Sequence, residues 1–472
     1  MRFPLSKSFI ASLMLAIVYL FNNAALAIEP YKNGKQLLIE NSEISGKENG
    51  FFVSVPVDYN DLTKGTTEIY VHFRSPYNPN LPTYAFFTGG PGQSSHFPSG
   101  GKADMYGNLG YNFLLFDQRG IAFSRPEVEQ LWKNPDFHSS ENNARDLEEI
   151  RKFLKIDKIS IYGASYGTVP ATIYGNLFPK SARSVVLEGV VFDGFDMTPQ
   201  HSKFLPTTAQ KYFDSLPPAL KEKLNRISDD VILPKMWVPA YIQAYLQFSG
   251  TQQLAALTTL LEGAAKVEDK NFLNEFTRLQ TIAHEGIIFP KSLDENLVHF
   301  LLMGKEFGFT RTDVITQLVL ENGKIVRQKT GMASGYVNEA RNLGMPLDKK
   351  STYIASDYPL SVPTYYINGS HDGATIAPWA IKHWKSVPKA ASYLLILKGG
   401  GHMPGGQILR SDTNEKNVTG QQAEYFFNHI FKKMLDGNPI FQTDINELNG
   451  KGIAKMVFTS KNISFKKCQK LF

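Results

Sequence analysis

The chain has 472 residues, of which 42% are hydrophobic, 20% are charged and 12% are aromatic, and it contains a single cysteine. These proportions are typical of a folded globular protein and exclude a disordered chain, a collagen-like fibre and a disulfide-stapled scaffold. The formal net charge is +6, and Lys and Arg are interleaved with Asp and Glu along the chain. Nucleic acid is therefore not expected as a partner.

The N-terminal segment has the pattern of a secretory signal peptide. Arg2 and Lys7 precede an apolar run from Phe9 to Phe21, and Ala25-Leu26-Ala27 then offers a cleavage site with small residues. The alternative is a membrane anchor, but the run has 13 residues, whereas about 20 are needed to span a bilayer. We expect residues 1–27 to be removed and the mature protein to be periplasmic or secreted, without a membrane partner.

The remaining chain is too long for one hydrophobic core, and the segment patterns indicate where it divides. Short β-rich runs alternate with helical patterns from about residue 50 to 195 and resume near residue 362, which predicts an α/β fold with a mostly parallel sheet covered on both faces. Between them, long helical patterns predict an inserted helical domain. The predicted units are residues 1–27 (signal peptide), 28–195 (first part of the core), 196–355 (helical cap), 356–437 (second part of the core) and 438–472 (a polar C-terminal extension).

Several segments show the 3.6-residue periodicity of helices. In 140–155 the apolar residues recur at helical spacing, and most of the charged residues lie on the other side. Similar patterns over 209–226, 238–263 and 268–284 predict the helices of the inserted domain, and 419–435 predicts a late helix in the core. The only cysteine, Cys468, lies near the C-terminus, so no intramolecular disulfide can form.

Gly163-Ala164-Ser165-Tyr166-Gly167 is a GxSxG sequence placed between a β-run, 158–162, and a helix-compatible stretch, 166–177. In this context the pentapeptide predicts a nucleophile elbow, a sharp turn that projects the serine. The glycines suit such a turn because a side chain on either flank would collide with the neighbouring strand or helix. The alternative is an ordinary glycine-containing turn with an idle serine.

A serine nucleophile needs a histidine base that is oriented by an acid, and elbow-bearing enzymes supply them in the order Ser, Asp or Glu, His. Asp372 follows the strand-like run 362–367, and His402 follows the next one, 393–397. We therefore predict a catalytic triad of Ser165, Asp372 and His402. His371 is adjacent to Asp372, but neighbouring loop side chains usually diverge, which favours His402 as the base.

A glycine-rich turn, Thr88-Gly89-Gly90-Pro91-Gly92, follows another predicted strand, 83–87. Small residues there would let the backbone approach a substrate and donate from its N–H groups. We assign the oxyanion hole to the N–H groups of Gly90 and Tyr166. No phosphate-binding GxxxxGK[ST] sequence and no spaced Cys/His set occurs, so neither a cofactor nor a metal is expected.

Five segments taken together resemble one family of peptidases. They are TGGPGQSS, FDQRGIAFSRP, GASYGT, the Asp372 loop and GGGHM, and the VPVDY segment at 55–59 resembles the N-terminal strand of one branch. This set is similar to the prolyl aminopeptidases and tripeptidyl aminopeptidases, which are serine peptidases of the α/β-hydrolase fold. The resemblance implies an α/β-hydrolase core with a helical cap, and hydrolysis at the free N-terminus of a peptide.

The chain departs from the family pattern at two motifs. Thr88 stands where the prolyl branch usually has His, and residues 121–124 replace the usual Thr-Gly-x-Ser after DQRG. Neither change touches the predicted triad, although both could alter the substrate pocket. We interpret Asp117 and Arg119 of the DQRG motif as a structural, ion-paired loop rather than as catalytic groups.

The resemblance also implies an acidic residue in the cap that holds the ammonium group of the substrate. The stretch 279–285 resembles a cap motif in which a helix ends in an acidic residue, which makes Glu285 the candidate. The prolyl-specific pattern of cap glutamates is not evident, which leaves proline specificity open.

The sequence thus favours a periplasmic or secreted serine aminopeptidase that acts on short peptides through an acyl-enzyme. Two alternatives remain open. A carboxylesterase could use the same triad on the same fold. A non-catalytic binding protein could use a hydrolase scaffold without turnover.

Overall fold

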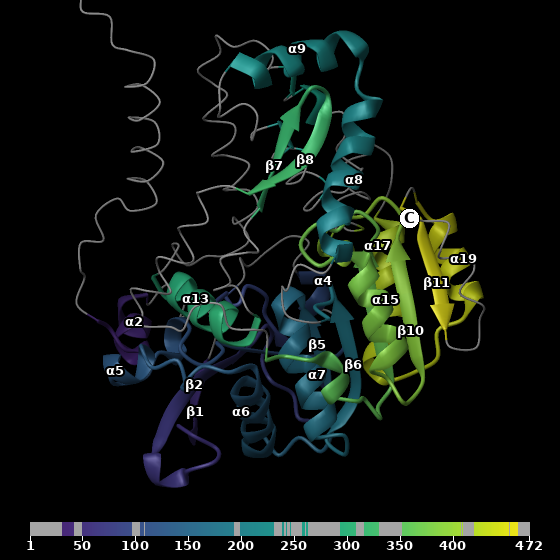
Figure 1. Cartoon of the computed structure of the whole chain (residues 1–472). Coiled ribbons are helices and arrows are strands. Elements are labelled where there is room, and N and C mark those ends of the chain that lie inside the picture. Colours follow the sequence, from purple (N-terminus) through teal and green to yellow (C-terminus); the bar gives the residue numbers. More distant parts are fainter. Residues whose placement is uncertain are drawn as a thin grey trace, which may run out of the picture.

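In a computed structural model of the chain (Figure 1), the described residues form an α/β core with an inserted domain. The described residues are 31–41, 50–96, 104–107, 109–192, 199–230, short helical pieces between 238 and 262, 293–307, 316–329, 352–406, 408, 420–452 and 454–460. Predictions for residues 1–27, the helix over 268–284, Glu285 and Cys468 lie outside them.

The core is a nine-stranded sheet with the order β1-β2-β4-β3-β5-β6-β9-β10-β11. Every pair from β4 to β10 is parallel, and the two edges, β1 with β2 and β11, are antiparallel. The strands of the core are β1 (Phe51–Pro56), β2 (Thr66–Phe73), β3 (Thr83–Phe87), β4 (Asn112–Phe116), β5 (Ile159–Ala164), β6 (Ala182–Glu188), β9 (Thr364–Gly369), β10 (Ser392–Leu397) and β11 (Met456–Ser460). The predicted mostly parallel sheet is confirmed.

The central strands are buried along their whole length because helices cover both faces of the sheet. All residues of β3, β4, β5 and β9 are buried, which is the burial expected of strands between two helical layers. One face packs on α6 (Ser140–Phe153), α7 (Thr168–Leu177) and α15 (Ala377–Ser386). The other face packs on α17 (Gln421–Tyr425), a π-helical turn (Phe426–Phe431), α18 (Lys432–Asp436) and α19 (Gln442–Gly450).

Helix α6 follows its predicted range closely. Its apolar residues Ala144, Leu147 and Ile150 are fully buried against the sheet. The side chain of Ser139 caps the helix by accepting from the N–H of Asn142 at 2.9 Å. The apolar period therefore determined both the location and the buried face of this helix.

The inserted region contains α8 (Pro199–Ser215), α9 (Pro218–Asp230) and a hairpin of β7 (Thr316–Glu321) and β8 (Lys324–Lys329), which share one apolar cluster above the core (Figure 1). The prediction of a single helix over 209–226 is wrong. Two helices replace it, because Pro217 and Pro218 cannot donate backbone hydrogen bonds to a continuing helix and proline suits the first turn of a new one.

The β7–β8 hairpin lies in the region where the sequence predicted mainly helices. Its turn is Asn322-Gly323, and both residues have positive φ angles, 48° and 75°. This is the geometry that Asn-Gly favours in a two-residue hairpin. The Asn322-Gly323 pair is the sequence signal for this hairpin.

Two further segments differ from the predicted domain boundaries. Helix α13 (Leu293–Phe307), placed in the cap by the sequence, buries Val298, Leu302 and Phe307 in the cluster that packs on the α6–α7 face of the sheet. The C-terminal extension predicted from residue 438 instead supplies α19 and β11, and β11 pairs antiparallel with β10. The core therefore continues to residue 460. Within the part of the chain that the structure describes, no helix combines the length and apolar character needed to cross a bilayer.

Candidate active site

Ser165 lies at a sharp turn between β5 and α7. Its φ angle is +54°, a left-handed conformation that is strained for a serine and that turns its side chain away from the strand. A Cβ atom at Gly167 would lie 2.1 Å from the carbonyl oxygen of Phe87, and one at Gly163 would lie 2.3 Å from the carbonyl oxygen of Gly167. Both flanking glycines are thus required by close backbone packing, as the sequence predicted.

The glycine-rich turn after β3 lies directly against Ser165. A Cβ atom at Gly89 would lie 3.2 Å from the Cβ atom of Ser165, so the backbone of the turn reaches the Ser165 side chain. Gly90 has a φ angle of +107°, which glycine adopts readily and other residues do not. The turn that contains Gly90 therefore lies against Ser165, and Tyr166 follows Ser165 directly in the chain.

Asp372 is fully buried in the loop that follows β9. Its carboxylate accepts from the N–H groups of Ala374 and Thr375 at 2.9 and 2.8 Å, and from the hydroxyl of Thr375 at 2.8 Å. These donors hold the carboxylate in one orientation. Thr375 was not singled out from the sequence, because an ordinary loop threonine carries no distinctive signal.

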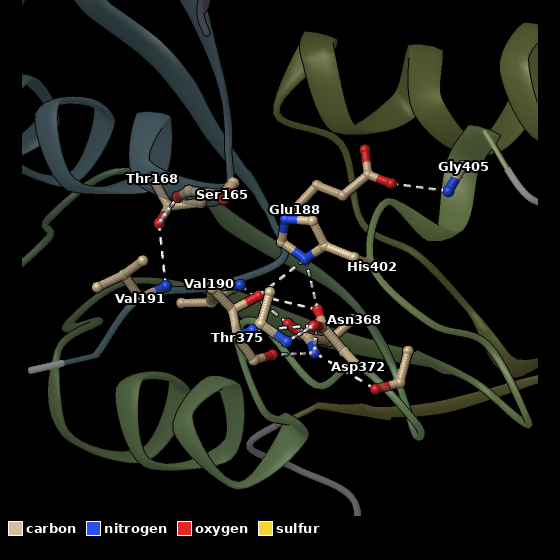
Figure 2. A network of polar contacts seen from close by, with 12 residues as sticks. Ser165, Thr168, Glu188, Val190, Val191, Asn368, Asp372, Thr375, His402 and Gly405 are labelled. Carbon is tan, nitrogen blue, oxygen red and sulfur yellow. Dashed lines mark hydrogen bonds and ion pairs between the residues drawn. The ribbon is translucent and has the colours of Figure 1, made fainter. Parts of the chain in front are cut away.

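His402 follows β10 and pairs with Asp372. Its Nδ1 lies 2.9 Å from Oδ2 of Asp372 and 3.2 Å from the hydroxyl of Thr375. Figure 2 shows Ser165 on the other side of the imidazole, where Nε2 lies. Ser165, Asp372 and His402 therefore follow β5, β9 and β10, respectively. Strands β9 and β10 are neighbours in the sheet, and β6 lies between β5 and β9.

Two opposing effects act on the pKa of His402. Burial lowers the pKa, but the negative charge of Asp372 and the hydrogen bond to it raise the pKa, and Glu188 raises it further. The balance leaves the pKa above the ordinary value for histidine. An imidazole in this setting can take up a proton from Ser165 readily.

His371 does not join this group of residues. Its Nδ1 lies 2.9 Å from the hydroxyl of Ser370, and its main-chain N–H donates to the carbonyl oxygen of Gly400 at 2.7 Å. Burial lowers its pKa, and Lys211 of α8 lowers it further. The adjacent side chains of His371 and Asp372 diverge, as expected for neighbouring loop residues.

A hydrogen-bond network joins the Ser165 turn to the Asp372 loop (Figure 2). The hydroxyl of Thr168 donates to the carbonyl oxygen of Ser165 at 2.7 Å and accepts from the N–H of Val191 at 3.1 Å. The side-chain oxygen of Asn368 accepts from the N–H of Val190 at 2.9 Å, and its amide donates to the carbonyl oxygen of Thr375 at 3.0 Å. The segment after β6 thereby bridges the two loops.

The DQRG motif is buried next to the glycine-rich turn, but Asp117 and Arg119 have separate partners. Asp117 pairs with His96 at 3.0 Å, and it also accepts from the N–H of Ser95 at 2.8 Å. Arg119 forms a two-point ion pair with Asp146, at 2.6 and 3.0 Å. Both residues therefore hold loops in place through buried pairs, and Arg119 does so against the middle of α6.

Gln118, the middle residue of the motif, was not singled out from the sequence. Its amide donates to the carbonyl oxygen of Thr88 at 3.0 Å, and its side-chain oxygen accepts from Asn143 at 2.9 Å. Asn143 in turn donates to the hydroxyl of Tyr166 at 3.2 Å. One glutamine side chain thus connects the two segments that carry Gly90 and Tyr166.

The hydroxyl of Tyr166 also meets the inserted region. It lies 3.0 Å from the hydroxyl of Ser140, which donates to the buried carboxylate of Glu306 on α13. The N–H of Ser140 donates to the same carboxylate at 2.8 Å. Helix α13 is therefore linked through Ser140 to Tyr166, the residue that follows Ser165.

Comparison with known proteins agrees with this geometry. A family described as the α/β-hydrolase fold matches residues 86–405, which include all three members of the candidate triad. A probable proline iminopeptidase of Leptolyngbya boryana is 28% identical over 124 residues, covering 25% of this chain and 35% of that protein. A tripeptidyl aminopeptidase of Streptomyces lividans is 29% identical over 146 residues, covering 22% of this chain and 27% of that protein.

A proline iminopeptidase of Arabidopsis thaliana is 27% identical over 211 residues, which cover 41% of this chain and 51% of that protein. The matched segments thus span about half or less of these relatives. The family match itself extends over more than half of the chain. The chain therefore belongs to the α/β-hydrolase family.

Proposed function

We propose that the protein is a serine aminopeptidase that hydrolyses short peptides at their free N-termini. The observation that carries this proposal is the pairing of His402 with Asp372 beside the Ser165 turn. The names of the curated relatives, proline iminopeptidase and tripeptidyl aminopeptidase, support the substrate class. The proposal includes release through an acyl-enzyme.

In the proposed reaction, Oγ of Ser165 attacks the scissile carbonyl carbon while its proton passes to Nε2 of His402. Asp372 keeps the imidazole in the tautomer that leaves Nε2 free to accept this proton. The N–H groups of Gly90 and Tyr166 donate to the carbonyl oxygen as it becomes negative. His402 then protonates the leaving amine, and water cleaves the acyl-enzyme by the same route.

The recognition of a free N-terminus requires a carboxylate near the ammonium group. Glu285 is the proposed partner, on the basis of the cap motif that it resembles, and it lies outside the described residues. Replacing Glu285 by Gln should raise KM for peptides with a free N-terminus while leaving the labelling of Ser165 by a fluorophosphonate unchanged. An unchanged KM would remove Glu285 from the proposal.

The location of the mature protein is also proposed from the sequence. The signal segment 1–27 supports export, which predicts a mature N-terminus at or near residue 28 in a periplasmic or secreted fraction. N-terminal sequencing of the protein recovered from each cellular fraction tests this. Full-length protein in the cytosol alone would contradict it.

A mixed peptide library with free N-termini, compared with the same library after N-acetylation, tests the function. Acetylation removes the ammonium group but leaves every original peptide bond available, so an aminopeptidase cleaves only the free library, and the product masses give the number of residues released. The Ser165→Ala variant should cleave neither library while keeping its melting temperature. Equal cleavage of both libraries would show a peptidase that does not need a free N-terminus and would overturn the proposal. Hydrolysis of esters with neither library cleaved would indicate an esterase instead.

A further inference from the structure

Glu188 is a buried carboxylate next to the candidate triad, and the reaction described above gives it no role. It is the last residue of β6, the strand between β5, which ends at the nucleophile, and β9, which ends at the Asp372 loop. The residue is 1% exposed. A buried carboxylate is costly unless specific partners hold it, so its contacts bear on why it lies there.

Both carboxylate oxygens of Glu188 have partners, and each partner belongs to a segment that carries a triad residue. Oε1 accepts from the main-chain N–H of Gly405 at 2.7 Å, and Gly405 lies three residues after His402. The other oxygen accepts from the hydroxyl of Tyr162 on β5, three residues before Ser165. Glu188 therefore ties the His402 loop to the strand that carries the nucleophile.

The side chain of Glu188 also lies close to the imidazole. Figure 2 shows it running past His402 on its way to Gly405. The end of β6 packs against the same ring, because a Cβ atom at Gly189 would lie 2.8 Å from Cε1 of His402. The negative charge of Glu188, like that of Asp372, raises the pKa of His402.

We propose that Glu188 is a positioning residue for His402, which holds the His402 loop through Gly405 and whose charge favours the imidazolium that forms during the reaction. This rests on the proposed triad of Ser165, His402 and Asp372. When Oγ of Ser165 bonds to the substrate carbon, the serine proton moves to Nε2 of His402. Glu188 neither gains nor loses a proton in this step.

The titratable groups around Glu188 and His402 determine how the pKa of His402 responds when the charge of Glu188 is removed. Among the described residues, the titratable groups acting on His402 are Asp372 and Glu188. Those acting on Glu188 are Tyr162, His402 and Asp372, and Tyr106 of α4 (Asp104–Gly107) acts on Tyr162. The pKa of Glu188 is raised above its ordinary value, chiefly by burial and further by the charge of Asp372, whereas the donors Tyr162 and Gly405 and the charge of His402 act against this rise.

The Glu188→Gln variant isolates the charge from the packing. Gln has the same shape, its oxygen can accept from Gly405, and its amide can donate to the oxygen of Tyr162. The readout is the rate at which a fluorophosphonate labels Ser165 as a function of pH, which requires no knowledge of the substrate. Labelling needs neutral His402, so the rate rises as the pH passes upward through the His402 pKa.

We expect the midpoint of this rise to move about one pH unit lower in Glu188→Gln, because a nearby negative charge that favoured the imidazolium has been removed. The rate on the plateau should fall by roughly three- to tenfold, since the imidazole becomes a weaker base. Glu148→Gln is the matched control. Glu148 is a buried carboxylate on α6 that accepts from the hydroxyl of Tyr174 at 2.9 Å, and its replacement should leave the midpoint unchanged.

Each result decides the proposal. A folded Glu188→Gln variant with the wild-type midpoint would overturn it and leave the triad standing. If Glu188→Gln does not fold, the pair Glu188→Asp and Glu188→Asn replaces it, since these two variants share a shorter side chain and differ in charge. The labelling midpoint of Glu188→Asn should then lie at a lower pH than that of Glu188→Asp. Equal midpoints would overturn the proposal. A wild-type protein that the probe does not label would overturn the proposed function, and this inference with it.

Discussion

The side-chain amide of Gln118 donates a hydrogen bond to the main-chain oxygen of Thr88, at the base of the glycine-rich turn that touches Ser165. The same side chain accepts from Asn143, which reaches the hydroxyl of Tyr166. A residue outside the triad thus fixes the relative position of the two backbone segments proposed to bind the oxyanion. This relationship gives the DQRG motif a physical role.

Replacing Gln118 by Ala should lower kcat by about tenfold to a hundredfold with little change in KM, because a small displacement of an oxyanion donor weakens binding of the transition state more than that of the substrate. Steady-state kinetics on a peptide cleaved by the wild type measures both constants. Gln422→Ala is the control, since Gln422 is also buried and donates to two carbonyl oxygens, of Leu448 and Ala454, in the C-terminal part of the core. An equal loss of kcat in both variants would contradict the positional role.

Replacing Asp372 by Asn should lower kcat by about 10³- to 10⁴-fold without preventing folding. The amide would donate toward Nδ1 of His402, and the imidazole would then carry its proton on Nε2, where it cannot accept from Ser165. The main-chain N–H groups of Ala374 and Thr375 donate to the other oxygen, Oδ1, and would still hold the loop. Turnover measured together with the melting temperature checks this, and a variant that retained more than a tenth of wild-type activity would rule out Asp372 as the orienting acid.

The pH dependence should report His402 and not His371. The charge and hydrogen bond of Asp372 hold the pKa of His402 above the ordinary histidine value despite burial, and protonated His402 cannot act as a base. The value of kcat/KM should therefore fall as the pH decreases through this raised pKa. Profiles of the wild type and of His371→Gln should have the same acid limb. If the acid limb disappears in His371→Gln, then His371 and not His402 is the base.

The Gly167→Ala substitution should destabilise the fold by about 1–3 kcal/mol or more, since the new methyl group would overlap the main chain of β3 and neither backbone can move freely. Gly450→Ala at the end of α19 is the control, because a Cβ atom there meets no atom within 4 Å. Denaturant unfolding of both variants measures the difference. Equal stability of the two would show that the close contact behind the nucleophile turn is not required.

Local sequence patterns determined most of the core. The predicted strand runs 83–87, 158–162, 362–367 and 393–397 match β3, β5, β9 and β10, and the periodicity of 140–155 located α6. These predictions succeeded because burial between two helical layers leaves a continuous apolar run, and burial of one helix face leaves a 3.6-residue period. The GxSxG turn, Asp372 and His402 could be recognised from the sequence for a similar reason. Each of them follows a strand of the parallel sheet, and these strands end at the same edge.

Other features depended on partners distant in the sequence. The segment Met456–Ser460 is a strand because β10 offers it an open edge, and nothing in its polar surroundings distinguishes it from a tail. Glu188 and Gly405 are 217 residues apart in sequence and share one hydrogen bond. Similarly, Ser140 meets Glu306 across 166 residues.

The sequence by itself determined the class of fold, the nucleophile turn and the candidate triad, since each of these follows from the order of local elements along the chain. Only the tertiary structure showed how Gln118 joins the two segments proposed to bind the oxyanion and that the carboxylate of Glu188 acts on His402. Such contacts depend on loop conformation and on the packing of side chains from separate strands. Neighbouring residues in the sequence do not encode them, because the direction of a buried side chain is set by the elements that surround it.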